Sequence, residues 1–230
     1  MAKPYHNYGK VWRLNVIDLT QPLGPATVLW PGSNPFEATV GGTLPESSYW
    51  RDLRLPEHAG THLDAPAHFA AGGATAEELP LDRLVRPAAM MDARELCGDP
   101  DAEIPAAAVE GFERAHGRLE AGEVLLVCTG WDRYLDDDER YSRFPGLSLE
   151  AAQLLVERGV SGIGIDTLGI EPRKASSFPA HQVTQAAGIW HLEALVNVDR
   201  VPPRRAWIAA AVIPVVAGSG APARAFAIIP

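Results

Sequence analysis

Cysteine is scarce in this chain. Cys97 and Cys128 are its two cysteines in 230 residues, and they do not form a C-x-x-C pair. Two cysteines are too few for a disulfide framework. We therefore expect both to be small buried hydrophobic residues of a protein from a reducing compartment.

Basic residues are outnumbered by acidic ones. The chain has 20 lysines and arginines against 29 aspartates and glutamates, a formal net charge of −9. Such a protein is repelled by the phosphates of nucleic acids and by anionic membrane surfaces. Both are excluded as main partners, and a small-molecule substrate is expected.

Long apolar runs are missing as well. The longest uncharged stretch, residues 206–223, is interrupted by Pro214, Gly218 and Pro222. It predicts a buried strand and a turn instead of a membrane span. The segment Met1–Lys10 is polar and lacks the apolar run of a signal peptide, so the expected location is the cytoplasm.

Two motifs of other enzyme classes are incomplete. Gly162-Ile163-Gly164 has no third glycine in register and no helix expected after it, which excludes a dinucleotide-binding turn. Ser219 lies in Ala217-Gly218-Ser219-Gly220, which is not the G-x-S-x-G of a nucleophile elbow. A serine hydrolase is therefore disfavoured.

The length suits one α/β domain spanning residues 1–230, without internal repeats or linkers. Hydrophobic patterning predicts strands at 16–19, 49–55 (half-buried), 87–92, 123–129, 160–166, 207–216 and 224–229. A short helical piece is expected at 77–85. One helix is opened by Glu103-Ile104-Pro105 and closed by Gly117, and another runs from the Ser148 cap to Gly159.

The most informative stretch is residues 57–69, which holds three histidines and an aspartate at even positions: His58, His62, Asp64 and His68. In an extended chain these side chains project to the same side. A helix would also bring His58 and His62 together, but Gly60 and the nearby Pro66 disfavour it. We predict a strand or extended loop, with room for an ion left by the missing side chain of Gly60.

This composition favours a metal site. Neutral imidazole is a common ligand of zinc and related ions, and a carboxylate neutralises part of the charge. The alternative is that the histidines are ordinary polar residues near a turn. Three histidines within eleven residues, out of seven in the whole chain, make a chance cluster a poor explanation.

The pattern H-x-G-T-H-x-D-x-P-x-H resembles the metal-dependent cyclase family of hydrolases, which includes bacterial kynurenine formamidases and isatin hydrolases. Similar landmarks are Leu29-Trp30-Pro31-Gly32, Thr129-Gly130-Trp131 and Gly164-Ile165-Asp166-Thr167. Many relatives then have a Ser-Ile-Asp segment, where this chain has Gly169-Ile170-Glu171. The resemblance implies a swivelling β/β/α fold, with a mixed curved sheet and helices outside, and a homodimer or homotetramer.

The resemblance also implies the site residues. His58, His62 and Asp64 would hold one ion, and Asp64 would bridge to a second ion held by His181 and Glu193. His191 competes with His181 for that position. His68 would be the catalytic acid/base, and Trp30 would contact substrate. From the sequence alone, Trp30 packed under its own loop is an equal alternative.

The expected function is metal-dependent hydrolysis of a small amide or related carbonyl compound, with two zinc ions and N-formylkynurenine as substrate. Three alternatives stay open: a mononuclear manganese enzyme of the isatin hydrolase type, in which His181 acts in catalysis; a polyketide-type cyclase; and a non-catalytic metal-binding module. Structural metal sites usually employ cysteine, which this cluster lacks.

Overall fold

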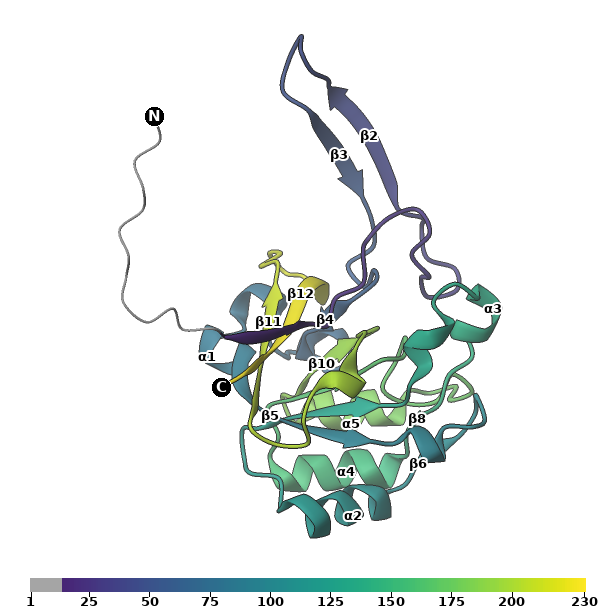
Figure 1. Cartoon of the computed structure of the whole chain (residues 1–230), viewed down its shortest axis with the longest axis vertical. Helices are drawn as coiled ribbons and strands as arrows, with labels where there is room; N and C mark the ends of the chain where they lie inside the picture. Colours follow the sequence, from purple (N-terminus) through teal and green to yellow (C-terminus); the bar gives the residue numbers. More distant parts are fainter. Residues whose placement is uncertain (1–13) are drawn as a thin grey trace.

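The structure, a computed structural model, describes residues 14–230. Within this range eight strands form one sheet in the order β1-β12-β11-β5-β7-β9-β10-β4. Strand β12 (Gly220–Ile229) also pairs with β4 (His62–Asp64), which closes the sheet into a barrel (Figure 1). The predicted α/β fold with a curved mixed sheet is confirmed. The segment Met1–Lys10, expected to lack a signal peptide, lies outside the described residues.

One half of the barrel is mostly parallel. Strands β5 (Val85–Asp92), β7 (Val124–Cys128), β9 (Gly162–Ile165) and β10 (Trp190–Glu193) run in the same direction. Their outer face is covered by helices α2 (Ala106–His116), α4 (Leu149–Arg158) and α5 (Pro179–Ala186) (Figure 1). Burial on both faces explains the continuous apolar run of β7, as expected for a parallel strand under helices.

The other half is antiparallel. Strand β11 (Ala206–Val212) joins β5 to β12, and β1 (Asn15–Asp18) pairs with the last residues of β12. The first residues of β12 pair instead with β4, so this long strand holds β4 against the rest of the barrel. The predicted strand at 207–216 ends early, at Val212, because a turn containing Pro214 follows.

Side chains of alternating strand residues fill two separate cores. Leu126 and Leu63 belong to the core inside the barrel, whereas Leu125 and Ile163 pack outside against the helices. On β9 the inward positions are Gly162 and Gly164, where a Cβ atom would come within 2.6 Å of the Trp190 ring or 2.5 Å of Leu126. These glycines therefore allow close packing inside the barrel, and they are not part of a dinucleotide-binding turn.

A two-stranded arm projects from the barrel (Figure 1). It consists of β2 (Glu37–Gly42) and β3 (Trp50–Arg54), which pair only with each other among the described strands. The predicted strand at 49–55 is correct in position, but its expected half-burial is wrong. All five residues of β3 are exposed, because no other layer of the described chain covers the arm.

The helix caps follow the local sequence. The Ser148 hydroxyl accepts from the backbone N–H of Ala151, and Gly159 ends α4 in the left-handed conformation. Helix α2 begins one residue later than expected, because Glu103–Ile104 forms β6 and Pro105 is the cap. The remaining short elements are α1 (Leu81–Leu84), α3 (Asp138–Tyr141), β8 (Gly146–Leu147) and the 3-10 turns at Pro66–His68, Ala76–Glu78, Arg94–Leu96, Trp131–Tyr134 and Val198–Arg200.

The expected burial of the two cysteines is confirmed. Cys97 and Cys128 are free and buried. Burial raises the pKa of the Cys97 thiol to about 12, so this side chain behaves as a hydrophobic residue. Across residues 14–230, no helix has the length and apolar character needed to cross a membrane.

Substitution of Leu126 tests whether the core inside the barrel stabilises the fold. It is fully buried, and Leu126→Ala should lower the free energy of unfolding by about 2–5 kcal/mol, because lost burial and a residual cavity add together. Urea denaturation followed by circular dichroism measures this change. Leu81, which is 79% exposed, is the matched control, and Leu81→Ala should change stability by less than about 0.5 kcal/mol. Equal effects of the two substitutions would contradict the core assignment.

Candidate metal centre

Strand β4 places two donors on the outer face of the barrel. Leu63 points into the inner core, so its neighbours His62 and Asp64 point outward. The antiparallel register sets Glu193 of β10 opposite His62, and His191 opposite Asp64. Residues directly opposite in such a pair have neighbouring side chains. The strand register alone therefore gathers four polar side chains on one patch.

The predicted extended segment is only partly a strand. Gly60 adopts the left-handed conformation with φ of +59°, and His68 ends the 3-10 turn Pro66–His68. The four side chains still converge, but through a turn, a short strand and another turn. The expected role of Gly60 is wrong: a Cβ there would contact Leu23 and Thr27 and not the site, so glycine is needed for its φ angle.

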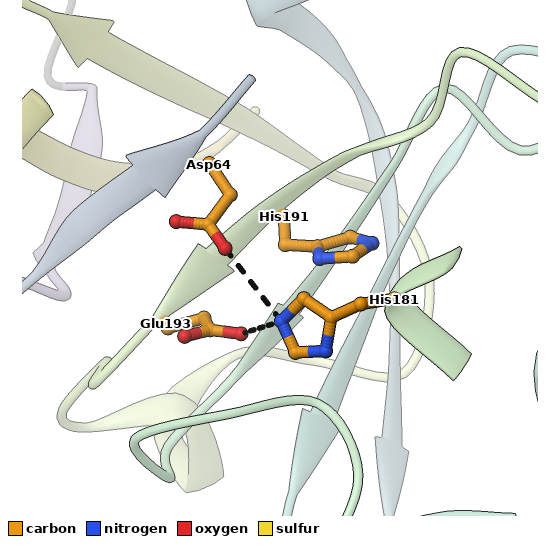
Figure 2. A group of neighbouring side chains, drawn as sticks. All are labelled: Asp64, His181, His191 and Glu193. Atoms are coloured by element: carbon orange, nitrogen blue, oxygen red, sulfur yellow. Dashed lines mark hydrogen bonds and ion pairs between the residues drawn. The ribbon is translucent and has the colours of Figure 1, made fainter. Parts of the chain in front are cut away.

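Helix α5 brings His181 to this patch. Its Nε2 atom lies 3.0 Å from Glu193 Oε1 and 3.6 Å from Asp64 Oδ2, as the dashed lines in Figure 2 show. The distant histidine and glutamate that the family resemblance implied are thus brought together with the His62–Asp64 strand.

Asp64 lies at the centre of the donors. Its Oδ1 atom is 2.6 Å from His58 Nδ1 and 3.2 Å from His62 Nε2. His62 Nε2 is also 3.5 Å from Glu193 Oε2. Nitrogen and oxygen ligands at about 2.0–2.2 Å from one ion are separated by comparable distances. The donor set therefore fits a divalent cation, with Asp64 as its most connected member.

Outer partners fix which ring nitrogen faces the centre. His62 Nδ1 donates to the Gly60 carbonyl oxygen at 2.8 Å, which leaves Nε2 for the carboxylates. His181 Nδ1 lies 3.1 Å from Glu171 Oε2, and that carboxylate also accepts from the His181 backbone N–H at 2.9 Å. Because a carbonyl and a carboxylate only accept, a proton on Nδ1 is favoured in both rings. Nε2 is then the nitrogen turned toward Asp64 and Glu193, as in metal-binding histidines.

The electrostatics of the centre favour positive charge. Burial by itself lowers the pKa of His62, but hydrogen bonds to Asp64 and Glu193 outweigh it and raise this pKa to about 10. Burial raises the pKa of Asp64, yet hydrogen bonds from His181 and His58 hold it well below its usual value. The two carboxylates thus stay ionised and attract either protons or a cation.

His191 lies beside the other donors in Figure 2. Its ring is hydrogen-bonded to residues outside the centre. Its Nε2 atom is 2.8 Å from Thr184 Oγ1, and its Nδ1 atom is 3.4 Å from Gln185 Nε2. Burial, together with the charge of His181, lowers its pKa to about 3. His181 therefore has the better geometry for a ligand, and the role of each remains a prediction.

His68 lies at the edge of the centre. Its ring stacks on that of His58 with centroids 4.0 Å apart, and its Nε2 atom is 3.9 Å from Asp64 Oδ2. This side chain is partly exposed, unlike the donors on β4 and β10. Burial lowers its pKa from the usual value, which keeps the ring neutral at pH 7.

A cavity of about 290 Å³ opens onto the donors. Its walls are largely aromatic and apolar, from Trp30, Phe69, Leu168 and Phe178. Trp30 is half-buried and packs against Phe178, with ring centroids 5.7 Å apart. The structure thus brings the predicted substrate contact Trp30 to the same cavity as the predicted ligands.

Three residues here were not anticipated as site residues. Glu171, where this chain departs from the relatives' pattern, accepts from the His181 backbone N–H and lies beside the His181 ring. Phe178 has a left-handed backbone with φ of +51°, unusual for a residue other than glycine, and lines the cavity. Phe69 is the last residue of the histidine-rich stretch 57–69, and this position is the one available sequence signal.

A match to a family model identifies the family of this chain. The Cyclase family model, described as "Putative cyclase", matches residues 17–172. The chain belongs to the cyclase family.

Curated relatives of the chain are hydrolases. It is 32% identical to an isatin hydrolase of Roseibium aggregatum over 198 residues, 79% of this chain and 75% of the relative. It is 31% identical to a kynurenine formamidase of Salinibacter ruber over 213 residues, 91% and 95% of the two chains. This cyclase-family chain is therefore a hydrolase.

Solved structures of hydrolases resemble this chain over most of its length. A crystal structure of an isatin hydrolase bound to the product analogue thioisatinate has a TM-score of 0.88 and 28% identity, over 94% of this chain and 93% of that one. A potential metal-dependent hydrolase with cyclase activity has a TM-score of 0.77 and 29% identity, over 95% and 99%. With the His/Asp/Glu cluster, this supports a divalent metal at the centre.

Asp64 is the most connected donor. Asp64→Asn should weaken divalent-metal binding by more than about 100-fold, beyond the loss typical of outer partners, because the negative charge at the centre of the donors disappears. Elemental analysis and competition with a chelator measure the effect. The exposed Asp52 on β3 is the matched control, and Asp52→Asn should bind metal normally. If the Asp64→Asn variant keeps its fold and its full metal content, Asp64 is not a metal ligand.

Proposed function

We propose that this cyclase-family chain hydrolyses the C–N bond of a small aryl amide at a two-metal centre. The observation that carries the proposal is the aromatic cavity that opens directly onto the donors around Asp64, with His68 beside it. A planar aryl group fits between such walls, and its carbonyl then faces the donors. A non-catalytic metal module would have no need of this cavity.

The proposed ligands fall into two groups. His58, His62 and Asp64 would hold one ion, and Asp64 with His181 and Glu193 the other; zinc is the expected metal. When bound, divalent ions supply Lewis acidity for the carbonyl and make water more acidic.

His68 is the proposed acid/base. Its ring is neutral at pH 7, partly exposed and beside the donors, so it can accept a proton. The oxygen of water adds to the carbonyl carbon, the C–N bond breaks, and a proton from that water passes through His68 to the leaving nitrogen. The products are an amine and a carboxylic acid, and the imidazole is restored.

The walls orient the substrate. Trp30 and Phe69 both contact Phe178, with centroid distances of 5.7 and 5.4 Å, which makes a continuous aromatic surface. Offset or edge-to-face contacts with an aryl ring stabilise it beyond the burial of its area. The left-handed Phe178 backbone, which costs on the order of 1–3 kcal/mol, is a local strain of the kind found at binding sites.

The charge of the side chains that line the cavity indicates the charge of the substrate. Across residues 14–230, the side chains that line the cavity include no lysine or arginine. This favours a neutral cyclic amide of the isatin kind, which needs no counter-ion. N-Formylkynurenine is the second candidate, favoured by Arg173, whose guanidinium lies 4.6 Å from the centroid of the Trp30 ring and could pair with the α-carboxylate.

A direct assay decides between these substrates. The zinc-loaded and manganese-loaded proteins are each given isatin and N-formylkynurenine, and ring opening or deformylation is followed by absorbance. We expect hydrolysis of at least one, abolished by a chelator, and two ions per chain by elemental analysis. No turnover of either compound by the metal-loaded protein would overturn the proposal, and one ion per chain would favour the mononuclear alternative.

His68→Ala separates catalysis from metal binding. Loss of the acid/base group should lower kcat by about 10²–10⁴-fold, while metal content stays as in the wild type. His116→Ala, at the exposed end of α2, is the matched control and should keep full activity. Undiminished turnover after loss of the His68 imidazole would exclude it from the mechanism.

A further inference from the structure

Ser219 and Glu57 form a hydrogen-bonded chain with His58. Ser219 Oγ lies 2.9 Å from His58 Nε2 and 2.7 Å from Glu57 Oε2. The same carboxylate oxygen accepts from the Ser219 backbone N–H at 3.1 Å. The other ring nitrogen of His58, Nδ1, faces Asp64. Ser219 is the serine already rejected as a nucleophile, so its place beside the metal centre needs another explanation.

The direction of each hydrogen bond follows from the chemistry of the groups. An ionised carboxylate only accepts, so the single hydroxyl proton of Ser219 is donated to Glu57. The hydroxyl oxygen is then an acceptor toward His58, which must carry its proton on Nε2. A ring whose Nε2 holds a proton in this way can offer only Nδ1 to a cation, and Nδ1 is the atom that lies 2.6 Å from Asp64 Oδ1.

His58 differs in this respect from the other two histidines of the centre. The outer partners of His62 and His181 are a carbonyl and a carboxylate, which can only accept. A serine hydroxyl alone could equally donate to His58 Nε2 and hold the proton on Nδ1, which would block that ligand. Glu57 removes this ambiguity, because it takes the serine proton.

The backbone around Ser219 holds it in place. Its carbonyl oxygen accepts from the N–H of Ala65, directly after β4, at 2.9 Å. A Cβ atom on Gly220 would come within 2.8 Å of His58 Cε1 and 2.4 Å of the Leu63 carbonyl oxygen. Glycine at 220 therefore lets the serine segment lie against both the histidine ring and the ligand strand.

We propose that Ser219 and Glu57 are positioning residues that hold the His58 proton on Nε2 and thereby present Nδ1 to the metal. This inference rests on the proposed metal centre. Neither residue needs to touch the ion: Ser219 acts on His58, and Glu57 acts through Ser219. Such outer partners typically change metal affinity by about 10–100-fold.

The first test is metal affinity, measured by competition between zinc and a chelator. Ser219→Ala should weaken zinc binding by about 10–100-fold. Ser219→Thr retains the hydroxyl and should bind as the wild type does. Glu57→Ala frees the serine proton to block His58 and should weaken binding in the same way, whereas Glu57→Gln keeps an oxygen acceptor and should lose less. The double variant Ser219→Ala/Glu57→Ala should bind as Ser219→Ala alone, because Glu57 acts through Ser219.

The second test is nitrogen-15 NMR of the zinc-loaded wild type, which distinguishes protonated from metal-bound imidazole nitrogens. We expect His58 to carry its proton on Nε2 and zinc on Nδ1. Zinc on Nε2, or unchanged affinity in the folded Ser219→Ala and Glu57→Ala variants, would overturn this inference alone. A wild-type protein that binds no zinc would instead overturn the proposed function.

Discussion

Two buried carboxylates placed side by side are the constraint on which the site depends. Asp64 and Glu193 are each under 4% exposed, and they belong to one group of donors whose atoms lie within 4.8 Å of one another. At that separation two negative charges repel by roughly 3 kcal/mol or more at an effective dielectric constant near 20. Positive charge must therefore accompany them.

The barrel keeps these carboxylates together despite the repulsion. Strand β4 is hydrogen-bonded on one side to β10, which carries Glu193, and on the other to β12. It is thus an interior strand, although it contains three residues. Because its register with β10 cannot slip without moving Leu63 out of the core, the positions of His62 and Asp64 are tied to the folding of the whole sheet.

The donors closest in sequence could be predicted from the sequence. His58, His62, Asp64 and His68 share a short segment, so any compact local conformation brings them near one another. Their path could not be deduced, since both neighbours of the left-handed Gly60 pair with residues far away in sequence: Ala59 bridges to Leu29, and the Thr61 hydroxyl accepts from the Gln21 backbone N–H. His181 and Glu193 carried no local signal and were suggested by family resemblance, because α5 and β10 meet β4 only in the folded barrel.

Longer-range features were harder to foresee. The strand at 49–55 has an alternating pattern that resembles half-burial, but the pattern says nothing about whether a second layer exists. The link between Ser219 and His58 spans 161 residues and depends on the pairing of β12 with β4. Patterns within a window of ten residues cannot report such pairings.

The centre and its cavity are built from different kinds of structure. The donors on β4, β10 and α5 belong to regular elements, whereas Trp30, Phe69 and Phe178 lie outside helices and strands. Exchanges in the connecting segments can reshape the aromatic walls without disturbing the pairing that holds the carboxylates. One barrel can therefore diversify its choice of substrate through its loops while inheriting the same reaction chemistry unchanged.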